Sequence, residues 1–273
     1  MTTLDTGTDQ LLCSVDDAVA TITLNRPEKR NALSDVLTPA LRQILLTLES
    51  DRNVRCVVLT GAGSAFCAGG DVSGMGAGYS ETPERRSHED AVRDLIRREE
   101  TLTLRLHELA KPTIAALPGA AAGAGFSIAL ACDLRIGTES AFVKPAFANI
   151  GLSGDYGGSW FLTQLVGPAK AKELYFTSPR IGAAECLALG IFNEVVPDDQ
   201  FRARVAEVAR TIATGPPIAL TYMKNNINAA LTGDLRSCLA AEAEGTVRCM
   251  RTDDHGEAVK AFFDKRTPRF KGR

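Results

Sequence analysis

This chain lacks a surplus of either charge. Its 31 lysines and arginines nearly balance 33 aspartates and glutamates, which leaves a formal net charge of −2. A general nucleic-acid-binding surface needs a basic excess, so we expect no nucleic-acid partner. The sequence also has no apolar run of about 18 residues, the length that a membrane-spanning helix requires, so no membrane partner is expected. Residues 1–10 are polar and show no secretory signal, which favours a cytoplasmic location.

Cysteine patterns typical of disulfide frameworks and metal sites are absent as well. The seven cysteines are odd in number and have no metal-ligand spacing, and several lie in apolar runs, as buried reduced thiols do. Only three histidines occur, and none lies in a motif typical of a site. His88 and His107 stand among charged residues, so we expect them at the surface. The sequence therefore predicts no metal site.

The most informative feature that the chain does have is a stretch of small residues before an apolar run. Gly119 to Gly125 are all glycine or alanine, and the run from Phe126 to Cys132 has the composition of a buried helix. Small residues let backbone N–H groups approach a ligand, and a helix beginning there directs its free N–H groups to the same point. Such a turn binds an anion or a carbonyl oxygen that gains negative charge. The alternative is a tightly packed strand–helix turn.

A second glycine-rich loop strengthens the first interpretation. The run Cys56 to Thr60 is typical of a buried strand, and residues 61–71 follow it with five glycines. In open α/β folds, functional groups gather in loops that follow strands. Two such loops can each donate one N–H to the same oxygen.

The two loops together resemble those of the crotonase family, also called the enoyl-CoA hydratase/isomerase superfamily. Five segments carry the resemblance in the family's order: a coenzyme A (CoA) loop, two oxyanion loops, an active-site loop and the exit from the core. In this sequence they are residues 25–33, 66–72, 123–125, 150–158 and 181–197. The resemblance implies an α/β fold: a crotonase-type spiral of repeated ββα units over residues 1–200, followed by a C-terminal helical region over residues 201–273.

Local patterns are compatible with that architecture. Alternating and β-branched runs predict strands over residues 19–24, 54–60 and 113–117. Residues 34–48 are expected to form a helix, with Ser34 or Thr38 as its cap and Pro39 near its first turn. Residues 201–231 and 236–264 have the pattern of amphipathic helices. The polar stretch 74–98 is expected to be a loop that enters a helix.

The resemblance also implies a set of substrate contacts. The backbone N–H groups of Ala68 and Ala124 would hold the thioester oxygen of an acyl-CoA. CoA is carried by the substrate, and no other cofactor is expected. The further residues expected to contact substrate are Lys29, Arg30, Ala32, Gly69, Gly70, Asp71, Val72, Gly123, Phe147, Trp160, Phe263 and Lys265. In the family, the terminal segment of a neighbouring subunit covers the CoA, so we expect a homotrimer or a dimer of trimers.

The catalytic carboxylates of a typical hydratase in this family are missing. The positions that match its two glutamates are Ser127 and Phe147, and neither side chain can act as a carboxylate base. Asp155 follows four residues after Gly151, where branches of the family that move double bonds or rearrange ring acyl-CoAs carry an aspartate. One carboxylate is sufficient to remove a proton at one carbon and return it at another. The sequence therefore favours an isomerase, with Asp155 as its acid–base group.

Several alternatives stay open at this stage. Asp155 is also where a dehalogenase branch carries its nucleophile, which would make the protein a hydrolase or dehalogenase, with Glu99 or Glu100 as a second acid or base. The protein may also be a hydratase after all, or a non-catalytic acyl-CoA-binding protein. A serine hydrolase would need Ser127 with His107 or His255, but the nucleophile motif around Ser127 lacks its last glycine.

Overall fold

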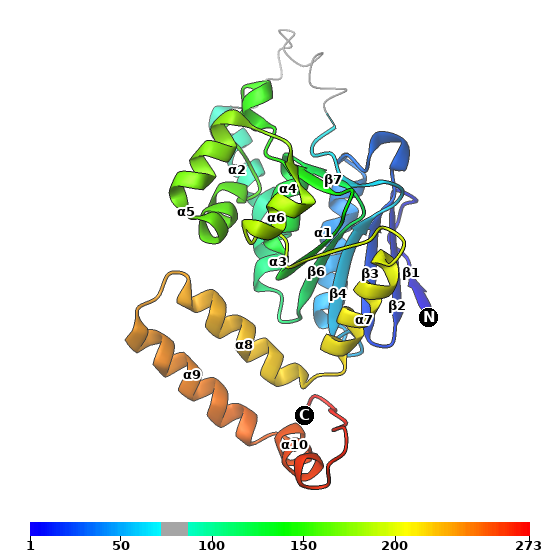
Figure 1. Ribbon diagram of the computed structural model, residues 1–273, viewed down its shortest axis with the longest axis vertical. Coiled ribbons are helices and arrows are strands. Elements are labelled where there is room, and N and C mark those ends of the chain that lie inside the picture. Colours follow the sequence, from blue (N-terminus) through cyan, green and yellow to red (C-terminus); the bar gives the residue numbers. More distant parts are fainter. Residues whose placement is uncertain (72–86) are drawn as a thin grey trace.

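The computed structural model describes residues 1–71 and 87–273. Val72, one of the expected substrate contacts, lies outside the described residues, as does most of the 74–98 loop. The main sheet has seven strands in the order β1-β2-β3-β4-β6-β8-β11 (Figure 1). Their bounds are Thr2–Leu4, Leu11–Asp16, Val19–Leu24, Cys56–Gly61, Thr113–Leu117, Leu134–Thr138 and Glu194–Val196.

The central strands of this sheet confirm the expected positions. The predicted strands 19–24 and 113–117 are β3 and β6, and the third begins two residues later than predicted, as β4 at Cys56. From β3 to β11 all neighbouring strands are parallel, and β6 is buried at every residue. Parallel strands covered on both faces have continuous apolar runs rather than alternation, which is why these segments were recognisable.

A second, smaller sheet positions the two glycine-rich loops. It has the order β10-β9-β7-β5, with bounds Ile181–Gly182, Phe142–Lys144, Ala120–Ala122 and Ala65–Cys67. Strands β5 and β7 are parallel neighbours, so the loops that follow them leave the sheet at the same edge. This is the expected repetition of strand, strand and helix.

Helices cover the sheets and fill the space between them. They are α1 (Leu37–Ser50), α2 (His88–Glu99), α3 (Arg105–Glu108), α4 (Ala124–Ala131), α5 (Gly158–Thr177) and α6 (Ala183–Ala188), with short helical turns η1 (Pro27–Lys29), η3 (Glu100–Leu104) and η4 (Phe147–Ile150). Helix α1 starts three residues later than Ser34, whose hydroxyl accepts from the Leu37 N–H at 3.0 Å. Pro39 therefore lies in the first turn, where its missing N–H breaks no helical hydrogen bond. Helix α4 is buried at every residue.

The C-terminal region is helical as predicted and divides into two parts. Helix α7 (Phe201–Ala213) packs through Phe201, Val205 and Ala209 on the main sheet. Helices α8 (Pro217–Ala230), α9 (Leu235–Met250) and α10 (Asp253–Phe263) project from the core, with α8 and α9 side by side (Figure 1). In the part of the chain that the structure describes, no helix is both long and apolar enough to cross a membrane.

Candidate active site

The two glycine-rich loops touch at the end of the small sheet. Gly69 has a φ of +94°, and a Cβ there would lie 2.8 Å from the Ala122 carbonyl oxygen and 3.5 Å from the Ala124 nitrogen. A Cβ on Gly125 would lie 2.3 Å from the carbonyl oxygen of Cys67. Since no side chain fits at either position, the glycines are what allows the two backbones to come this close.

Hydrogen bonds from the CoA loop decide which N–H groups of the first loop remain available. The Ala68 N–H donates to the Arg30 carbonyl at 3.0 Å, and the Asp71 N–H donates to the Leu33 carbonyl at 3.0 Å. The Leu33 N–H in turn donates to the Gly69 carbonyl at 2.8 Å. Among the described residues, none accepts a hydrogen bond from the Gly70 N–H.

The prediction that the Ala68 N–H holds a substrate oxygen is therefore wrong. That N–H is already bonded within the protein, and a donor cannot serve two acceptors at full strength. The Gly70 N–H, two residues further along, is the available donor, and Gly70 lines the neighbouring cavity. Gly70 was expected only among the substrate contacts, because the hydrogen bonds that select it come from a loop about 40 residues away in sequence.

The second loop supplies its donor as expected. Ala124 is the first residue of α4, where helix geometry leaves the N–H without an intrahelical acceptor. Gly123 precedes it with a φ of +51°, and its own N–H is bonded to the Lys144 carbonyl at 3.0 Å. A cavity of about 1100 Å³ brings Ala124 together with Gly70, Asp71 and Asp155. Two backbone donors and one carboxylate thus face the same space.

Asp155 lies in a loop of left-handed turns at the wall of this cavity. Gly154, Tyr156 and Gly157 have φ values of +114°, +52° and +71°. The Asp155 side chain is half-buried, and its Oδ1 atom is buried without a hydrogen-bond partner in the described part of the chain. Burial, together with the negative charge of Glu99, raises the pKa of Asp155 from 3.8 to about 6. A carboxyl in this state can accept and release a proton near neutral pH.

The positions that lack glutamates are filled by packing. Ser127 is fully buried, and its hydroxyl donates to the Gly123 carbonyl at 3.4 Å. Phe147 is also buried and stacks on Tyr175, with ring centroids 6.0 Å apart. A Cβ on Gly158 would lie 2.2 Å from the Ser127 hydroxyl oxygen and 2.6 Å from that of Tyr175, so these side chains are closely packed beneath the Asp155 loop. Phe147 thus supports the loop from below.

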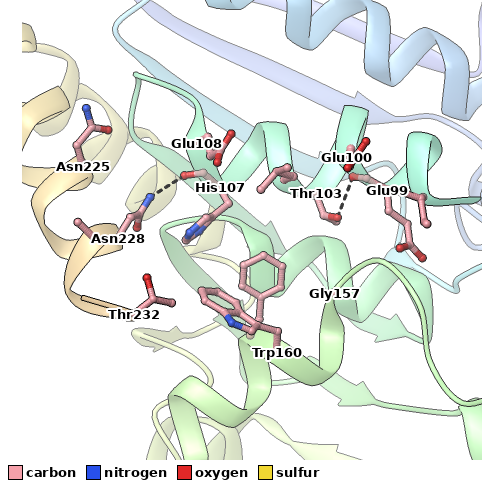
Figure 2. Close-up of a pocket in the computed structure, with 14 residues that line it drawn as sticks. Glu99, Glu100, Thr103, His107, Glu108, Gly157, Trp160, Asn225, Asn228 and Thr232 are labelled. Carbon is pink, nitrogen blue, oxygen red and sulfur yellow. Dashed lines mark hydrogen bonds between the residues drawn. The ribbon is translucent and has the colours of Figure 1, made fainter. Parts of the chain in front are cut away.

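Trp160 lines a second cavity, on the other side of the Asp155 loop (Figure 2). This cavity has a volume of about 720 Å³ and lies between α2–α3, the start of α5 and the end of α8. His107 packs edge-on against Trp160 and Phe161, each with centroids 5.4 Å apart. His107 is therefore half-buried rather than at the surface as expected, and burial lowers its pKa. We call this space, between Glu99 and Thr232, the aromatic pocket.

The CoA loop contains a residue that the sequence interpretation missed. Arg26 donates to the Ala32 carbonyl at 2.7 Å and pairs with Asp71 at 3.0 Å, so it ties the CoA loop to the first oxyanion loop. Ala32 is buried, whereas Lys29 and Arg30 are exposed and available to a phosphate. An arginine between two loops that both approach the ligand is a signal that could have been used.

Phe263 and Lys265 lie at the end of α10, far from the cavity of the same chain (Figure 1). Phe263 is 77% exposed. The structure therefore does not bring these two residues to the site that holds Asp155, and their expected role depends on a neighbouring subunit.

Two further alternatives lack the geometry that they need. Ser127 has no exposed surface and is bonded to a carbonyl, while His107 is held between aromatic rings, so the pair of a serine hydrolase is missing from the described residues. A search of residues 1–71 and 87–273 finds no group of three side chains able to hold a metal ion.

Comparisons with known proteins agree with the geometry of the two loops. A family model described as enoyl-CoA hydratase/isomerase matches residues 14–273. The chain is 35% identical to a 1,2-epoxyphenylacetyl-CoA isomerase of Escherichia coli, over 96% of this chain and 98% of that protein. It is 34% identical to a 4-chlorobenzoyl coenzyme A dehalogenase of Arthrobacter, over 91% of this chain and 88% of that protein. The crystal structure of an enoyl-CoA hydratase from Bacillus anthracis superposes with a TM-score of 0.89 at 34% identity, covering 97% of this chain and 100% of that chain.

Proposed function

Because this chain belongs to the enoyl-CoA hydratase/isomerase family, a family of acyl-CoA-converting enzymes, we propose that it shifts a double bond in an acyl-CoA without adding water. The observation that carries the proposal is the single carboxylate of the site. Asp155 faces the cavity that holds Gly70 and Ala124, while the two positions of the hydratase glutamates are a buried serine and a buried phenylalanine.

In the proposed mechanism, the N–H groups of Gly70 and Ala124 bind the thioester oxygen. They stabilise the enolate that forms when a proton leaves the α-carbon, or the γ-carbon of a 2-enoyl group. A well-placed donor of this kind contributes on the order of 3 kcal/mol. Asp155 takes the proton from one carbon and returns it to another, so no atom is gained or lost. The only group that the reaction needs beyond the chain is CoA, which arrives with the substrate.

Hydration is the competing reaction, and several relatives are named as hydratases. Adding water needs a base for the water and an acid for the carbon, which two carboxylates with separated pKa values can provide. In this site Ser127 and Phe147 leave Asp155 without a second carboxylate at those positions. The dehalogenase relative keeps a second option open, with Asp155 as a nucleophile on a halogenated ring.

The acyl group that fits best carries a ring. The aromatic pocket adjoins the Asp155 loop through Gly157 and offers the edges and faces of Trp160 and Phe161. Aromatic side chains in edge-to-face clusters bind a further ring favourably. Two of the relatives described above are named for ring acyl-CoAs. We therefore propose that a ring acyl group, or a chain ending in one, is converted.

The same proposal includes an assembly of three subunits or of two trimers. Helices α8–α10 leave large apolar side chains exposed, among them Ile227 (66%), Leu235 (75%) and Phe262 (79%). Apolar residues in such number at the projecting end of a chain mark a surface that another subunit covers. In that arrangement Phe263 and Lys265 of one subunit would cover the CoA of the next.

A panel of acyl-CoAs with mass and ultraviolet detection tests the reaction class. Isomerisation leaves the mass unchanged and shifts the absorbance of the conjugated thioester. Hydration adds one water, and thioester hydrolysis releases CoA. We expect isomerisation of an unsaturated acyl-CoA that is lost in Asp155→Ala. Efficient hydration of crotonyl-CoA that survives Asp155→Ala would defeat the proposal.

A further inference from the structure

We propose that Glu99 is a positioning residue for Asp155: its carboxylate holds the Asp155 loop in place and sets the charge that the Asp155 carboxyl faces. This inference rests on the proposed function for its catalytic meaning, but the contact itself is a feature of the fold. Glu99 Oε1 accepts a hydrogen bond of 2.9 Å from the backbone N–H of Tyr156, the residue directly after Asp155.

The hydrogen bond is placed where the loop needs support. Tyr156 is a non-glycine residue with a φ of +52°, and Gly154 and Gly157 on either side also have positive φ values. Such a conformation is unfavourable for a residue with a side chain and persists only when its surroundings hold it. The Tyr156 ring is buried and its hydroxyl interacts with Arg42 on α1, while its backbone is held by Glu99 on α2. The residue is thus fixed from two sides.

The backbone around Glu99 is itself unusual. Helix α2 ends at Glu99, and the chain continues as a π-helical turn, η3. The Thr103 hydroxyl donates to the Glu99 carbonyl at 3.2 Å within that turn. A single wide turn displaces the following side chains from their regular helical positions, and such turns are frequent at functional sites. Figure 2 shows the result, because the carboxylates of Glu99 and Glu100 point in different directions. Only Glu99 is bonded to the Asp155 loop.

Other charged groups near Asp155 are compensated by their own partners. Those that line the cavity or lie against the loop are Arg42, Asp71, Asp94, Arg97, Arg98 and Tyr175. Arg97 and Arg98 both pair with Asp94 at 2.7 Å, and Asp71 pairs with Arg26 at 3.0 Å. Arg42 interacts with the Tyr156 hydroxyl. Of the carboxylates, it is Glu99 that adds to burial in raising the pKa of Asp155.

Two substitutions separate the roles of Glu99. Glu99→Gln keeps an oxygen that can accept from the Tyr156 N–H but removes the negative charge. Glu99→Ala removes both. Glu100→Gln is the matched control, because it removes a carboxylate from the next residue, at the same pocket, without touching the Asp155 loop. Selective ¹³C labelling of aspartate carboxyl groups reports the Asp155 titration directly, with Asp155→Asn identifying its signal.

We expect Glu99→Gln to lower the titration midpoint of Asp155 by about half a unit to one unit, as the loss of a nearby like charge should. In the acyl-CoA assay, the acidic limb of kcat/KM should move by the same amount, with KM little changed. Glu99→Ala should also reduce kcat by roughly tenfold, because the loop loses its support. Glu100→Gln should leave the midpoint, the limb and kcat as in the unmodified protein.

An unchanged midpoint in Glu99→Gln, or an equal shift in Glu100→Gln, would overturn the inference. The titration does not require turnover. If no acyl-CoA is isomerised, the proposed function fails while the ¹³C measurement still decides whether Glu99 controls Asp155. If isomerisation is found and the midpoint does not move, Glu99 fails and the proposed function stands.

Discussion

Replacing Asp155 with asparagine should make the protein more stable at alkaline pH while it removes activity. The pKa of Asp155 is raised from 3.8 to about 6, so the folded protein binds this proton more tightly than the unfolded chain does. The stabilising effect of the bound proton is fully present below about pH 4 and is lost as the pH rises through 6. Above that pH, folding keeps an ionised carboxylate partly buried, which is unfavourable.

The magnitude follows from the shift. A difference of about two pKa units corresponds to about 3 kcal/mol between the two protonation states. The Asp155 side chain is only half-buried, so solvent screens part of this, and we take about 1–2 kcal/mol as the expected effect. Asparagine is uncharged and has nearly the same shape. Asp155→Asn should therefore exceed the unmodified protein by about 1–2 kcal/mol in unfolding free energy at pH 8 and match it near pH 4.

Urea unfolding at a series of pH values measures this difference, and the acyl-CoA assay measures activity in the same samples. Turnover should fall by roughly 10²–10⁴-fold, the usual contribution of a positioned acid–base group, with substrate binding little changed. Glu100→Gln serves as a control for the loss of a carboxylate at the same face. A variant that is equally stable at both pH values, or less stable at pH 8, would refute the environment that we assign to Asp155. Near-normal turnover would show that Asp155 only forms the loop.

Three other predictions address the oxyanion loops, the pocket and the assembly. Gly125→Ala should lower the unfolding free energy by about 1–3 kcal/mol in urea titrations, because its Cβ would lie 2.3 Å from the Cys67 carbonyl oxygen; Gly256→Ala, with open space around it, is the control. Trp160→Ala should raise KM for ring acyl-CoAs by roughly tenfold and leave that for crotonyl-CoA within about twofold, and equal effects would argue against the ring pocket. Light scattering at micromolar concentration should give the mass of three or six chains, which a monomer would contradict.

The sequence predicted the parts of the fold that depend on local patterns. The β-branched run before Gly61 and the apolar run of β6 are unambiguous because parallel strands are covered on both faces. The start of α1 was within a few residues because Ser34 and Pro39 limit where a helix can begin. The resemblance correctly placed Ala124 and Asp155 at one cavity, since both are fixed by short loops that follow the strands of the small sheet.

What the sequence could not provide depends on contacts between distant segments. The choice between the Ala68 and Gly70 N–H groups is made by the carbonyl of Arg30, which accepts from the first and leaves the second available. His107 has charged neighbours in sequence, but α5 brings two aromatic rings against it. Glu99 and Glu100 were equivalent candidates until the π-helical turn separated their directions. None of these relations has a signal within ten residues of the group concerned.

The environment of Asp155 connects the expected instability of the site with its proposed chemistry. During isomerisation the carboxyl must hold the substrate proton while the enolate exists. For a carboxyl with an ordinary pKa of about 3.9, holding that proton at about pH 7.5 is unfavourable by about 5 kcal/mol, and a pKa near 6 reduces this to about 2 kcal/mol. The same difference of about 3 kcal/mol opposes folding when the carboxylate is ionised. Burial and the charge of Glu99 therefore make the resting site less stable and the intermediate more accessible, so Asp155→Asn should gain stability and lose turnover for a single physical reason.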